Sequence, residues 1–276
     1  MPDTRILISE PVPGSEGSYR LKFPGSFQSR KDDKIALVSL TMYYSFYNIT
    51  DLFENRTLIY SHGGRDFTIK FDEGYYEISD INNYIKMKMR EEGNVLLDDK
   101  GSYQYYIDVK LNINYYANTL TMKPVPSVLP AGWTNPHNMA LTGLTMMLKP
   151  QNKFGDLIGF ESENYPPLPQ DKVYMKNSVK KPVISPVQNI LIKTDWISDN
   201  RFHQNGDNLH NFTPSESFGS QISINPPEIS YIRILAGLKK EIVVRFVDQL
   251  NRPLILKDKE MLITLSLREP DDKEID

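Results

Sequence analysis

The dominant pattern along the chain is an alternation of apolar and polar residues with a period of two. Between residues 103 and 113 the odd positions are apolar or aromatic, and most of the even positions are polar. The same alternation runs through residues 36–46 and 261–267. Because successive side chains of a β-strand point to opposite faces, each run predicts a half-buried strand. In the first run we expect Tyr103 and Tyr105 to face the core.

Further runs of this kind predict an all-β protein. They cover residues 19–23, 57–61, 67–71, 119–123, 189–196, 229–235 and 241–248. Gly63 and Gly64 separate two of these runs and predict a tight hairpin, because glycine adopts positive φ at little cost. Pro253 follows the run 241–248 and ends that strand, since proline has no backbone N–H to donate to the hydrogen bonds of a central strand. About ten short strands separated by turns are typical of a sandwich or barrel.

One segment has helical periodicity instead. Residues 80–92 carry an apolar stripe at three- and four-residue steps, formed by Ile81, Tyr84, Ile85 and Met89. Ser79 is suited to cap its start and Gly93 to end it. We expect this helix to cover an open edge or end of the sandwich, because its stripe must be buried. A second, shorter helix is predicted over residues 152–158, ending at Gly159.

The chain reads as one elaborated domain over residues 1–268, followed by a charged tail over residues 269–276. Two proline-rich segments, residues 124–136 and 166–186, are insufficiently polar and repetitive for interdomain linkers. We expect both to be extended surface loops. No internal repeat with a fixed period is visible.

Composition narrows the function classes. The 276 residues carry a net charge of −3 and contain no cysteine, which excludes disulfides, thiolate metal sites and cysteine nucleophiles. The 16 tyrosines and 12 phenylalanines indicate a buried core. The acidic first residues lack the apolar core of a signal peptide, and no apolar run reaches the ~18 residues of a membrane span. We therefore expect a protein made in the cytoplasm or nucleus, not secreted, with no membrane span.

Candidate chemistry is sparse. The four histidines lack metal-ligand spacing, and the loop that holds His203 and His210 reads as a solvated loop. No nucleophile elbow, phosphate-binding loop or dinucleotide fingerprint occurs. The carboxylate pairs Asp98-Asp99 and Glu91-Glu92 read as solvated. We expect no catalytic residue, metal or cofactor, and no enzymatic activity.

Two clusters point to contacts instead. The lysines around Tyr174, namely Lys172, Lys176, Lys180 and Lys181, read as a solvated loop, with a weak contact to packaged DNA on an inner face as the alternative. The second cluster combines tryptophan, methionine and other apolar residues with few charges, as subunit interfaces do. Its interface candidates are Trp133, Met139, Leu144, Met146, Phe154, Leu157 and Phe160. Burial in a core strand and loop is the other interpretation of this cluster.

Four segments, in order, resemble the minor capsid (penton) proteins of polintons, adintoviruses and related virophages. Residues 34–49 are similar to the second strand of that family, and residues 67–85 to its strand–Gly-Tyr-Tyr–helix junction. Residues 154–160 resemble a recurrent leucine–glycine–phenylalanine turn, and residues 243–254 with the strand 262–267 resemble the closing strands. The order of the four segments carries the resemblance, because each one is short.

The resemblance implies a single jelly roll that forms a homopentamer at the five-fold vertices of an icosahedral capsid. Its implied neighbour is a separate double jelly-roll major capsid protein, and its implied location is the virion capsid. Gly64-Arg65-Asp66 has a different order from the integrin-binding Arg-Gly-Asp of some adenovirus-type pentons. Receptor binding through that tripeptide is therefore not implied.

Two other functions stay open. A compact double jelly-roll major capsid protein would form trimers, but the two halves of the chain show no parallel order of strands. A receptor- or carbohydrate-binding sandwich, such as a spike head, would need an exposed aromatic platform. Its candidates are Tyr103, Tyr105, Tyr106, Tyr115 and Tyr116, and the predicted burial of the first two weakens it.

Overall fold

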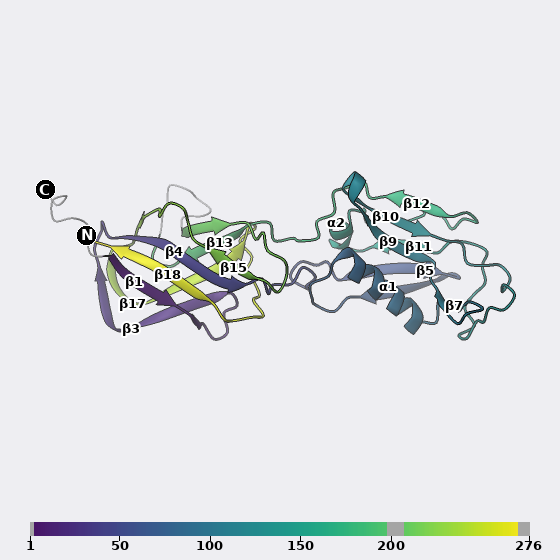
Figure 1. Cartoon of the computed structure of the whole chain (residues 1–276), viewed down its shortest axis with the longest axis horizontal. Helices are drawn as coiled ribbons and strands as arrows, with labels where there is room; N and C mark the ends of the chain where they lie inside the picture. Colours follow the sequence, from purple (N-terminus) through teal and green to yellow (C-terminus); the bar gives the residue numbers. More distant parts are fainter. Residues whose placement is uncertain (1–2, 198–206, 270–276) are drawn as a thin grey trace. The chain divides into compact units, whose positions relative to one another are not determined.

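The computed structural model describes residues 3–197 and 207–269 and divides the chain into two compact units. Unit 1 comprises the described residues of Met1–Phe46 and Val187–Asp276, and unit 2 is Tyr47–Pro186 (Figure 1). Unit 2 is therefore an insertion between two strands of unit 1, where the sequence analysis expected one elaborated domain. Alternation does not reveal this division, because strands of both units share the same pattern and the junctions lack linker composition. Apart from Glu269, the expected charged tail lies outside the described residues.

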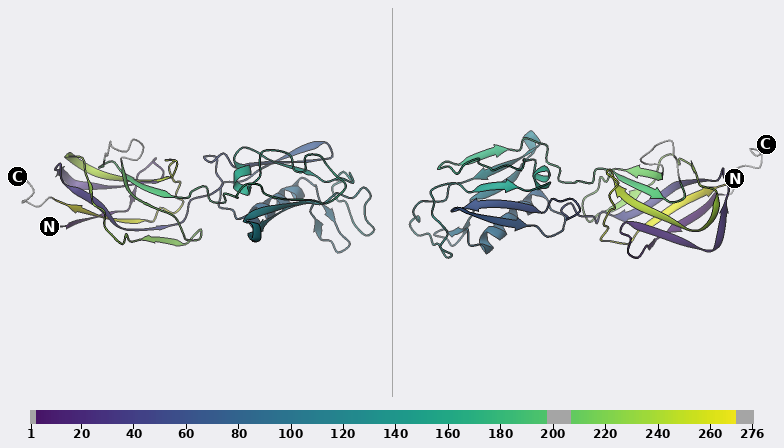
Figure 2. Two further views of the ribbon diagram at one scale, coloured as in Figure 1. Left: turned by 90° about the horizontal axis from the view of Figure 1, so that it is seen from above. Right: turned by 180° about the vertical axis from the view of Figure 1, so that it is seen from behind.

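Unit 1 consists of two antiparallel sheets, seen edge-on and face-on in Figure 2. The first sheet has the order β1 (Asp3–Ile8), β18 (Leu262–Arg268), β4 (Lys34–Tyr43) and β15 (Gln221–Ile224), with β16 (Ile232–Arg233) also paired to β4. The second has the order β14 (Asn208–Phe212), β13 (Ile190–Thr194), β17 (Gly237–Asp248), β3 (Ser18–Ser29) and β2 (Glu10–Pro11). The apolar faces of the two sheets form the core of this unit.

The strand order of unit 1 is that of a jelly roll. Its principal strands along the chain are β1, β3, β4, β13, β14, β15, β17 and β18. The first sheet takes the first, eighth, third and sixth of them, and the second sheet takes the second, seventh, fourth and fifth. Two interleaved Greek keys produce this order. The predicted all-β jelly roll with antiparallel sheets is confirmed, and within the described residues this order occurs in unit 1 alone.

A β-bulge changes which side of β4 faces the core. Ser39 pairs with Thr264 and Leu37 pairs with Leu265, so Val38 is the extra residue. Leu37 is buried and Val38 is only partly covered. Uninterrupted alternation would have placed Val38 inward, and this part of the prediction is wrong because the bulge shifts the register by one residue.

Unit 2 contains two three-stranded antiparallel sheets around its own core. One has the order β11 (Met147–Pro150), β5 (Thr57–His62) and β6 (Arg65–Lys70), and the other β12 (Tyr174–Asn177), β10 (Ala117–Met122) and β9 (Ile107–Asn112). A short ribbon pairs β7 (Leu96–Leu97) with β8 (Tyr103–Gln104). The predicted glycine hairpin joins β5 and β6, with positive φ at Gly63 and Gly64.

The main helix, α1 (Ile78–Glu91), belongs to unit 2 and lies against β9 (Figure 1). Its apolar stripe packs in the core of unit 2, because the insertion has its own sheets, whereas the sequence analysis expected the stripe on an open edge or end of the sandwich. The residue that caps its N-terminus is Glu77, which forms a capping box with Asp80; the sequence analysis expected Ser79.

The predicted short helix is present as α2 (Phe154–Ile158) and ends at Gly159 with φ of 82°. A single 3-10 turn, η1 (Ile113–Tyr115), follows β9. No helix in the described ranges is long and apolar enough to cross a membrane.

Asn48 ties together the start and the end of unit 2. Its side chain is buried, donates to the carbonyl oxygens of Tyr76 at 2.8 Å and Ile184 at 2.9 Å, and accepts from the Tyr76 N–H at 2.8 Å. Asn48 lies near the first residue of the unit and Ile184 near the last. The amide therefore holds the entering and leaving segments beside each other.

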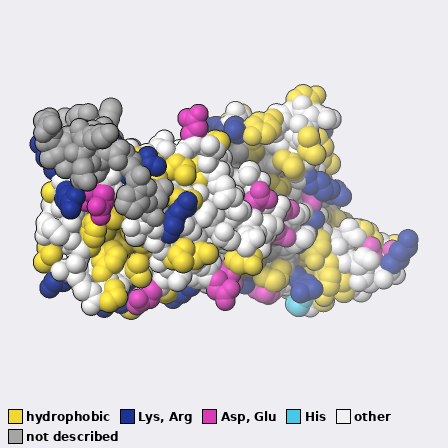
Figure 3. Space-filling view, turned by 60° about the vertical axis from the view of Figure 1, so that its left-hand side comes forward, with side chains coloured by type: hydrophobic (Ala, Val, Ile, Leu, Met, Phe, Trp, Pro, Cys, Tyr) yellow, Lys and Arg dark blue, Asp and Glu magenta, His cyan; other side chains and the backbone are white. Residues whose placement is uncertain are grey.

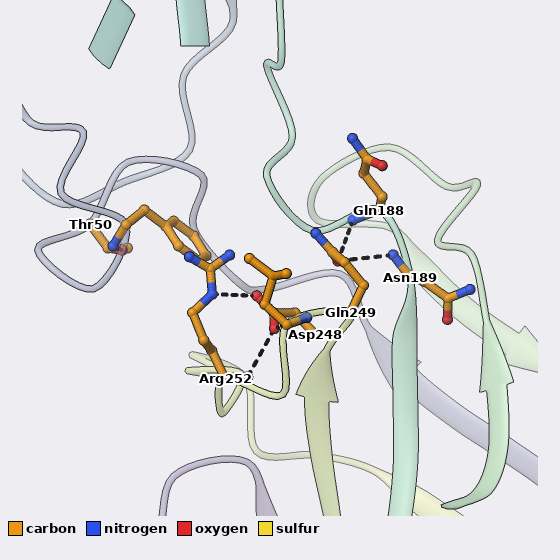
Figure 4. A network of polar contacts seen from close by, with 8 residues as sticks. Thr50, Gln188, Asn189, Asp248, Gln249 and Arg252 are labelled. Carbon is orange, nitrogen blue, oxygen red and sulfur yellow. Dashed lines mark hydrogen bonds and ion pairs between the residues drawn. The ribbon is translucent and has the colours of Figure 1, made fainter. Parts of the chain in front are cut away.

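A second polar network fixes the place where the chain returns to unit 1. The Gln249 Oε1 accepts from the backbone N–H groups of Gln188 at 3.0 Å and Asn189 at 3.3 Å (Figure 4). The preceding residue, Asp248, is fully buried and accepts from Arg252 Nε at 2.7 Å and from the Arg252 N–H at 2.9 Å. The predicted turn after β17 is thus built around a saturated buried carboxylate, which stabilises it.

Candidate assembly surface

The middle of the outer face of the first sheet of unit 1 consists of uncharged residues, and Arg5 and Arg268 lie toward one end of it. Cross-strand pairing places Leu7 beside Thr264 and Thr264 beside Ser39 in one row. The next row joins Leu262 to Thr41 and Thr41 to Ser223. Leu7 and Leu262 are 56% and 46% exposed, so each row combines one exposed leucine with two hydroxyl groups. We call these six residues the uncharged face.

A tyrosine closes one end of the uncharged face. The Tyr231 hydroxyl lies 3.0 Å from Ser266 Oγ on β18 and also accepts from the Arg268 guanidinium at 3.0 Å. The same guanidinium lies 3.9 Å from the Tyr231 ring centroid. This stacked arrangement is rigid and partly covers the strand end, because a guanidinium favours an aromatic face.

The outer face of the second sheet has the opposite character. Arg20 pairs with Glu10 at 3.1 Å, and Asp207 receives Lys193 at 2.8 Å and Arg245 at 3.4 Å. Lys22 and Glu241 lie opposite each other on β3 and β17 of the same sheet. Charged side chains with ion-pair partners keep a sheet face solvated, because removing them from water is costly.

The contrast between the two faces identifies the uncharged face as the better candidate for contact with another subunit. Covering it would remove apolar and hydroxyl groups from water without desolvating a row of charges, which are depleted in interface cores. In the space-filling view, hydrophobic side chains form several exposed patches on the part of the chain that comes forward, between singly placed charged side chains (Figure 3).

The interface candidates of the sequence analysis lie in unit 2, and most of them are buried there. Five belong to the core of that unit: Met139, Met146, Phe154, Leu157 and Phe160. Their side chains contact one another and the neighbouring strands, which is the core interpretation that the pattern also allowed. Trp133 is partly buried against the same core, and Leu144 is 38% exposed. An interface role for the seven residues stays a prediction.

The lysine cluster is balanced by nearby acids. Lys176 lies 3.7 Å from Glu163, and Lys180 lies 3.6 Å from both Asp156 and Glu161. Lys181 lies over the Tyr116 ring at 5.0 Å. These partners agree with a solvated surface loop, and the contact with packaged DNA stays a prediction.

The histidines make no metal site within the residues that the structure describes. His62 is buried and its Nε2 lies 2.9 Å from the carbonyl oxygen of Ala140. Burial lowers the pKa of His62, against a smaller opposite effect of that hydrogen bond. Burial also lowers the pKa of His210, and His203 lies outside the described residues.

Sequence reasoning missed the uncharged face. Its polar members, including Ser39, Thr41 and Thr264, were assigned to the solvent side of their strands, which is correct for their direction. Their lack of charge was the available signal, since the equivalent positions of β3 and β17 carry Arg20, Lys22 and Glu241. Only the pairing of strands far apart in sequence brings the six residues into one surface.

No protein-family model matches the chain, and no curated protein matches it significantly. Among solved structures, the chain is similar to the mavirus penton protein, with 11% sequence identity and a TM-score of 0.47. That likeness covers 96% of this chain and 98% of the mavirus chain. A chain of the Sputnik virophage is also similar, with 9% identity and a TM-score of 0.43, over 96% and 97% of the two chains.

Proposed function

We propose that the chain is a structural virion protein, the penton subunit of an icosahedral capsid, and that five copies form a ring at each five-fold vertex. The observation that carries the proposal is a jelly roll with one uncharged and one charged sheet face. The ordered resemblance of four sequence segments to penton proteins supports it independently. The proposed neighbour of the ring is a double jelly-roll major capsid protein.

A ring of identical subunits requires two different, complementary sides on each copy. We propose that the uncharged face provides one of them. Its two exposed leucines, Leu7 and Leu262, contribute apolar area, and its hydroxyl groups can exchange hydrogen bonds with a partner. The charged face of the second sheet remains in water. We propose unit 2, with its proline-rich loops, as decoration on the outside of the ring or at its interfaces.

The test is the absolute mass of the purified protein, measured by light scattering after gel filtration. We expect a species of about 159 kDa, five times the 31.8 kDa of one chain. A trimer near 95 kDa would contradict the proposal and favour a major capsid protein or a spike head. Negative-stain imaging at high concentration is the second readout, and single subunits in both experiments would count against self-assembly.

A pair of matched variants tests the uncharged face. Thr264→Arg places a charge at its centre and should convert pentamers to monomers, because an unpaired charge cannot be buried there. Asn211→Arg places the same charge on the exposed outer side of β14, in the second sheet, and should leave the mass unchanged. Pentamers that tolerate Thr264→Arg would remove the uncharged face from the ring contact.

A further inference from the structure

A groove of about 830 Å³ lies on the outer face of the β12–β10–β9 sheet in unit 2. Its floor is formed by alternate residues of β9 and β10, with Met175 of β12. One wall is the segment from Tyr103 to Tyr105, and Lys86 of α1 stands beside it. The volume falls within the range of small-molecule sites, roughly 300–1,000 Å³.

The wall of the groove is aromatic. Tyr103 is 40% exposed and Tyr105 is half-buried, with ring centroids 6.4 Å apart. The prediction that both face the core is wrong for Tyr103, because the strand is interrupted between β8 and β9. Tyr105 packs partly against the core of unit 2, and Tyr106 is buried. Arg90 lies 5.4 Å from the Tyr103 ring centroid, and Lys86 lies 5.7 Å from that of Tyr105, so the wall combines aromatic surface with cations. The exposed part of Tyr103 is apolar and electron-rich, so it attracts the C–H groups on one side of a sugar ring.

The floor presents amides and hydroxyls in fixed directions. Asn112 Nδ2 donates to Thr119 Oγ1 at 3.1 Å, and that hydroxyl donates to Asn177 Oδ1 at 2.7 Å. This relay crosses three strands and orients the Asn112 amide. Thr121 lies two residues further along the same face of β10. Oriented amides and hydroxyls of this kind suit a ligand with many hydroxyl groups.

A carboxylate holds two lysines in place at the centre of the floor. Asp108 Oδ1 lies 2.7 Å from Lys86 Nζ, and Oδ2 lies 2.8 Å from Lys110 Nζ. Burial raises the pKa of Asp108, but hydrogen bonds from Lys110, Lys86 and Asn82 outweigh it and hold this pKa below its usual range. Each ammonium group has three donors, so each keeps donors for a ligand after bonding Asp108.

The groove carries a net positive charge. Lys86, Lys110 and Lys123 line it, and Asp108 is the one acidic residue among its described lining. An anionic group would therefore be attracted, and it would meet ammonium groups that Asp108 already orients. Such preorganisation reduces the entropy lost on binding.

We propose that this groove binds an acidic glycan. A sugar ring stacks on the exposed Tyr103, its carboxylate or sulfate group pairs with Lys86 and Lys110, and its hydroxyl groups bond the floor. This proposal goes beyond assembly and does not depend on the number of subunits in the ring, because every lining residue belongs to one copy of unit 2.

Single-stranded nucleic acid also combines stacking with negative charge, but the groove suits it less. A phosphate backbone needs a continuous basic track. Here Asp108 lies among the basic residues, and neutral Asn112, Thr119 and Thr121 separate them on the floor. An acidic glycan needs only one or two anionic contacts and uses the remaining neutral groups.

The first experiment presents the full-length protein to an array of matched glycans that share a core and differ in a sialic acid, a sulfate or neither. We expect binding to the charged members, with a Kd on the order of a millimolar for one site. The uncharged core should bind at least about tenfold more weakly, since charge-assisted hydrogen bonds are lost. The sialylated and sulfated arms show which anion the lysines select.

Two variants and a control then locate the site. Lys110→Ser and Tyr103→Ala should each weaken binding of the best array glycan by about tenfold or more. The Lys110 side chain is 74% exposed, so its replacement leaves the fold intact. Lys149→Ser removes an exposed lysine from β11, in the other sheet of unit 2, and should leave affinity unchanged.

Absence of binding to every charged glycan at millimolar concentration would overturn the proposal, as would binding that neither groove variant alters. Competition by a single-stranded oligonucleotide at lower concentration than the glycan would assign the groove to nucleic acid and equally overturn it. The light-scattering mass of each variant keeps the result separate from assembly, since none of these residues lies in unit 1.

Discussion

Two buried tyrosines of unit 2 differ in whether their hydroxyl groups have a partner. Tyr60 is fully buried, and its hydroxyl accepts from Asn94 Nδ2 at 2.8 Å. Tyr106 is 5% exposed, and its hydroxyl has no hydrogen-bond partner among the described residues. A buried polar group without a partner costs free energy, whereas a paired one contributes modestly.

The two matched Tyr→Phe substitutions should therefore change stability in opposite directions. Tyr106→Phe removes an unpaired hydroxyl and should raise the free energy of unfolding by up to about 1 kcal/mol. Tyr60→Phe leaves the Asn94 amide without its acceptor and should lower it by about 1–2 kcal/mol. Urea unfolding followed by circular dichroism measures both. Changes of the same sign would contradict this interpretation.

The same tyrosines predict a loss of stability in alkali. Burial raises the pKa of each to about 12; at Tyr60 the Asn94 hydrogen bond opposes this and the charge of Glu92 adds to it. In the unfolded chain both would titrate near 10. Between these values the unfolded state releases protons that the folded state keeps. The free energy of unfolding is thus unaffected by these tyrosines below pH ~10 and falls as pH rises toward 12.

Each tyrosine should account for up to about 2–3 kcal/mol of this loss. Urea unfolding at a series of pH values between 9 and 12 measures it, with tyrosinate absorbance as the second signal. Tyr60→Phe should make the pH dependence shallower. Tyr115→Phe is the control, because Tyr115 is 73% exposed, and it should leave the dependence unchanged.

At the scale of elements, α1 protects an edge strand. β9 lies at the edge of its sheet, and the Val109 N–H donates to Asn82 Oδ1 of the helix at 2.9 Å. Asn82 is buried, and its Nδ2 also donates to Asp108 at 3.1 Å. A helix side chain thus occupies a donor on the edge that an added strand would use.

Asn82→Ala should lower the free energy of unfolding by about 2 kcal/mol, because the buried Val109 N–H loses its partner. It should also increase aggregation on heating, since the edge of β9 becomes available for pairing. Urea unfolding and light scattering during heating measure the two effects. Asn83→Ala, at the exposed neighbouring position, is the control and should change neither. Equal effects of both substitutions would refute the protective role.

Local pattern predicts most elements of this protein but not the positions where a strand changes course. Alternation identifies β4, β9 and β18, and helical periodicity identifies α1. The bulge at Val38 escapes it, because it depends on pairing with the distant strand β18. The break between β8 and β9 escapes it as well, because an alternating run does not show that its first residues pair with a different strand, β7, from the rest. The assembly surface and the groove escape it for the same reason. A polar position on a strand looks the same in sequence whether it faces water, a subunit or a ligand.

At the scale of the whole molecule, unit 2 has what an independent domain needs. It has its own core of buried residues, and Asn48 holds its entering and leaving segments beside each other. Chain termini that lie close together are typical of inserted domains. The jelly-roll order of unit 1, in turn, uses no strand of the insertion.

Residues 47–186 should therefore fold as an isolated fragment. We expect a dispersed NMR spectrum and cooperative unfolding in urea. The same fragment with Asn48→Ala should lose about 2–4 kcal/mol of stability, because three hydrogen bonds of one buried amide disappear. A fragment that stays unfolded would show that unit 2 depends on the jelly roll.

Replacing residues 47–186 by a short glycine linker should leave a folded unit 1.

The interrupted chain of unit 1 has a consequence for synthesis on the ribosome. β4 is central in the first sheet, but its partner strands β15, β16 and β18 all follow the insertion. At bacterial and eukaryotic elongation rates, β4 waits about 10 to 40 s before β15 leaves the tunnel. During that time unit 2 can finish folding while an apolar strand stands exposed behind it. We therefore expect a chaperone to bind the first strands of unit 1 in the nascent chain, whereas unit 2 can fold without one.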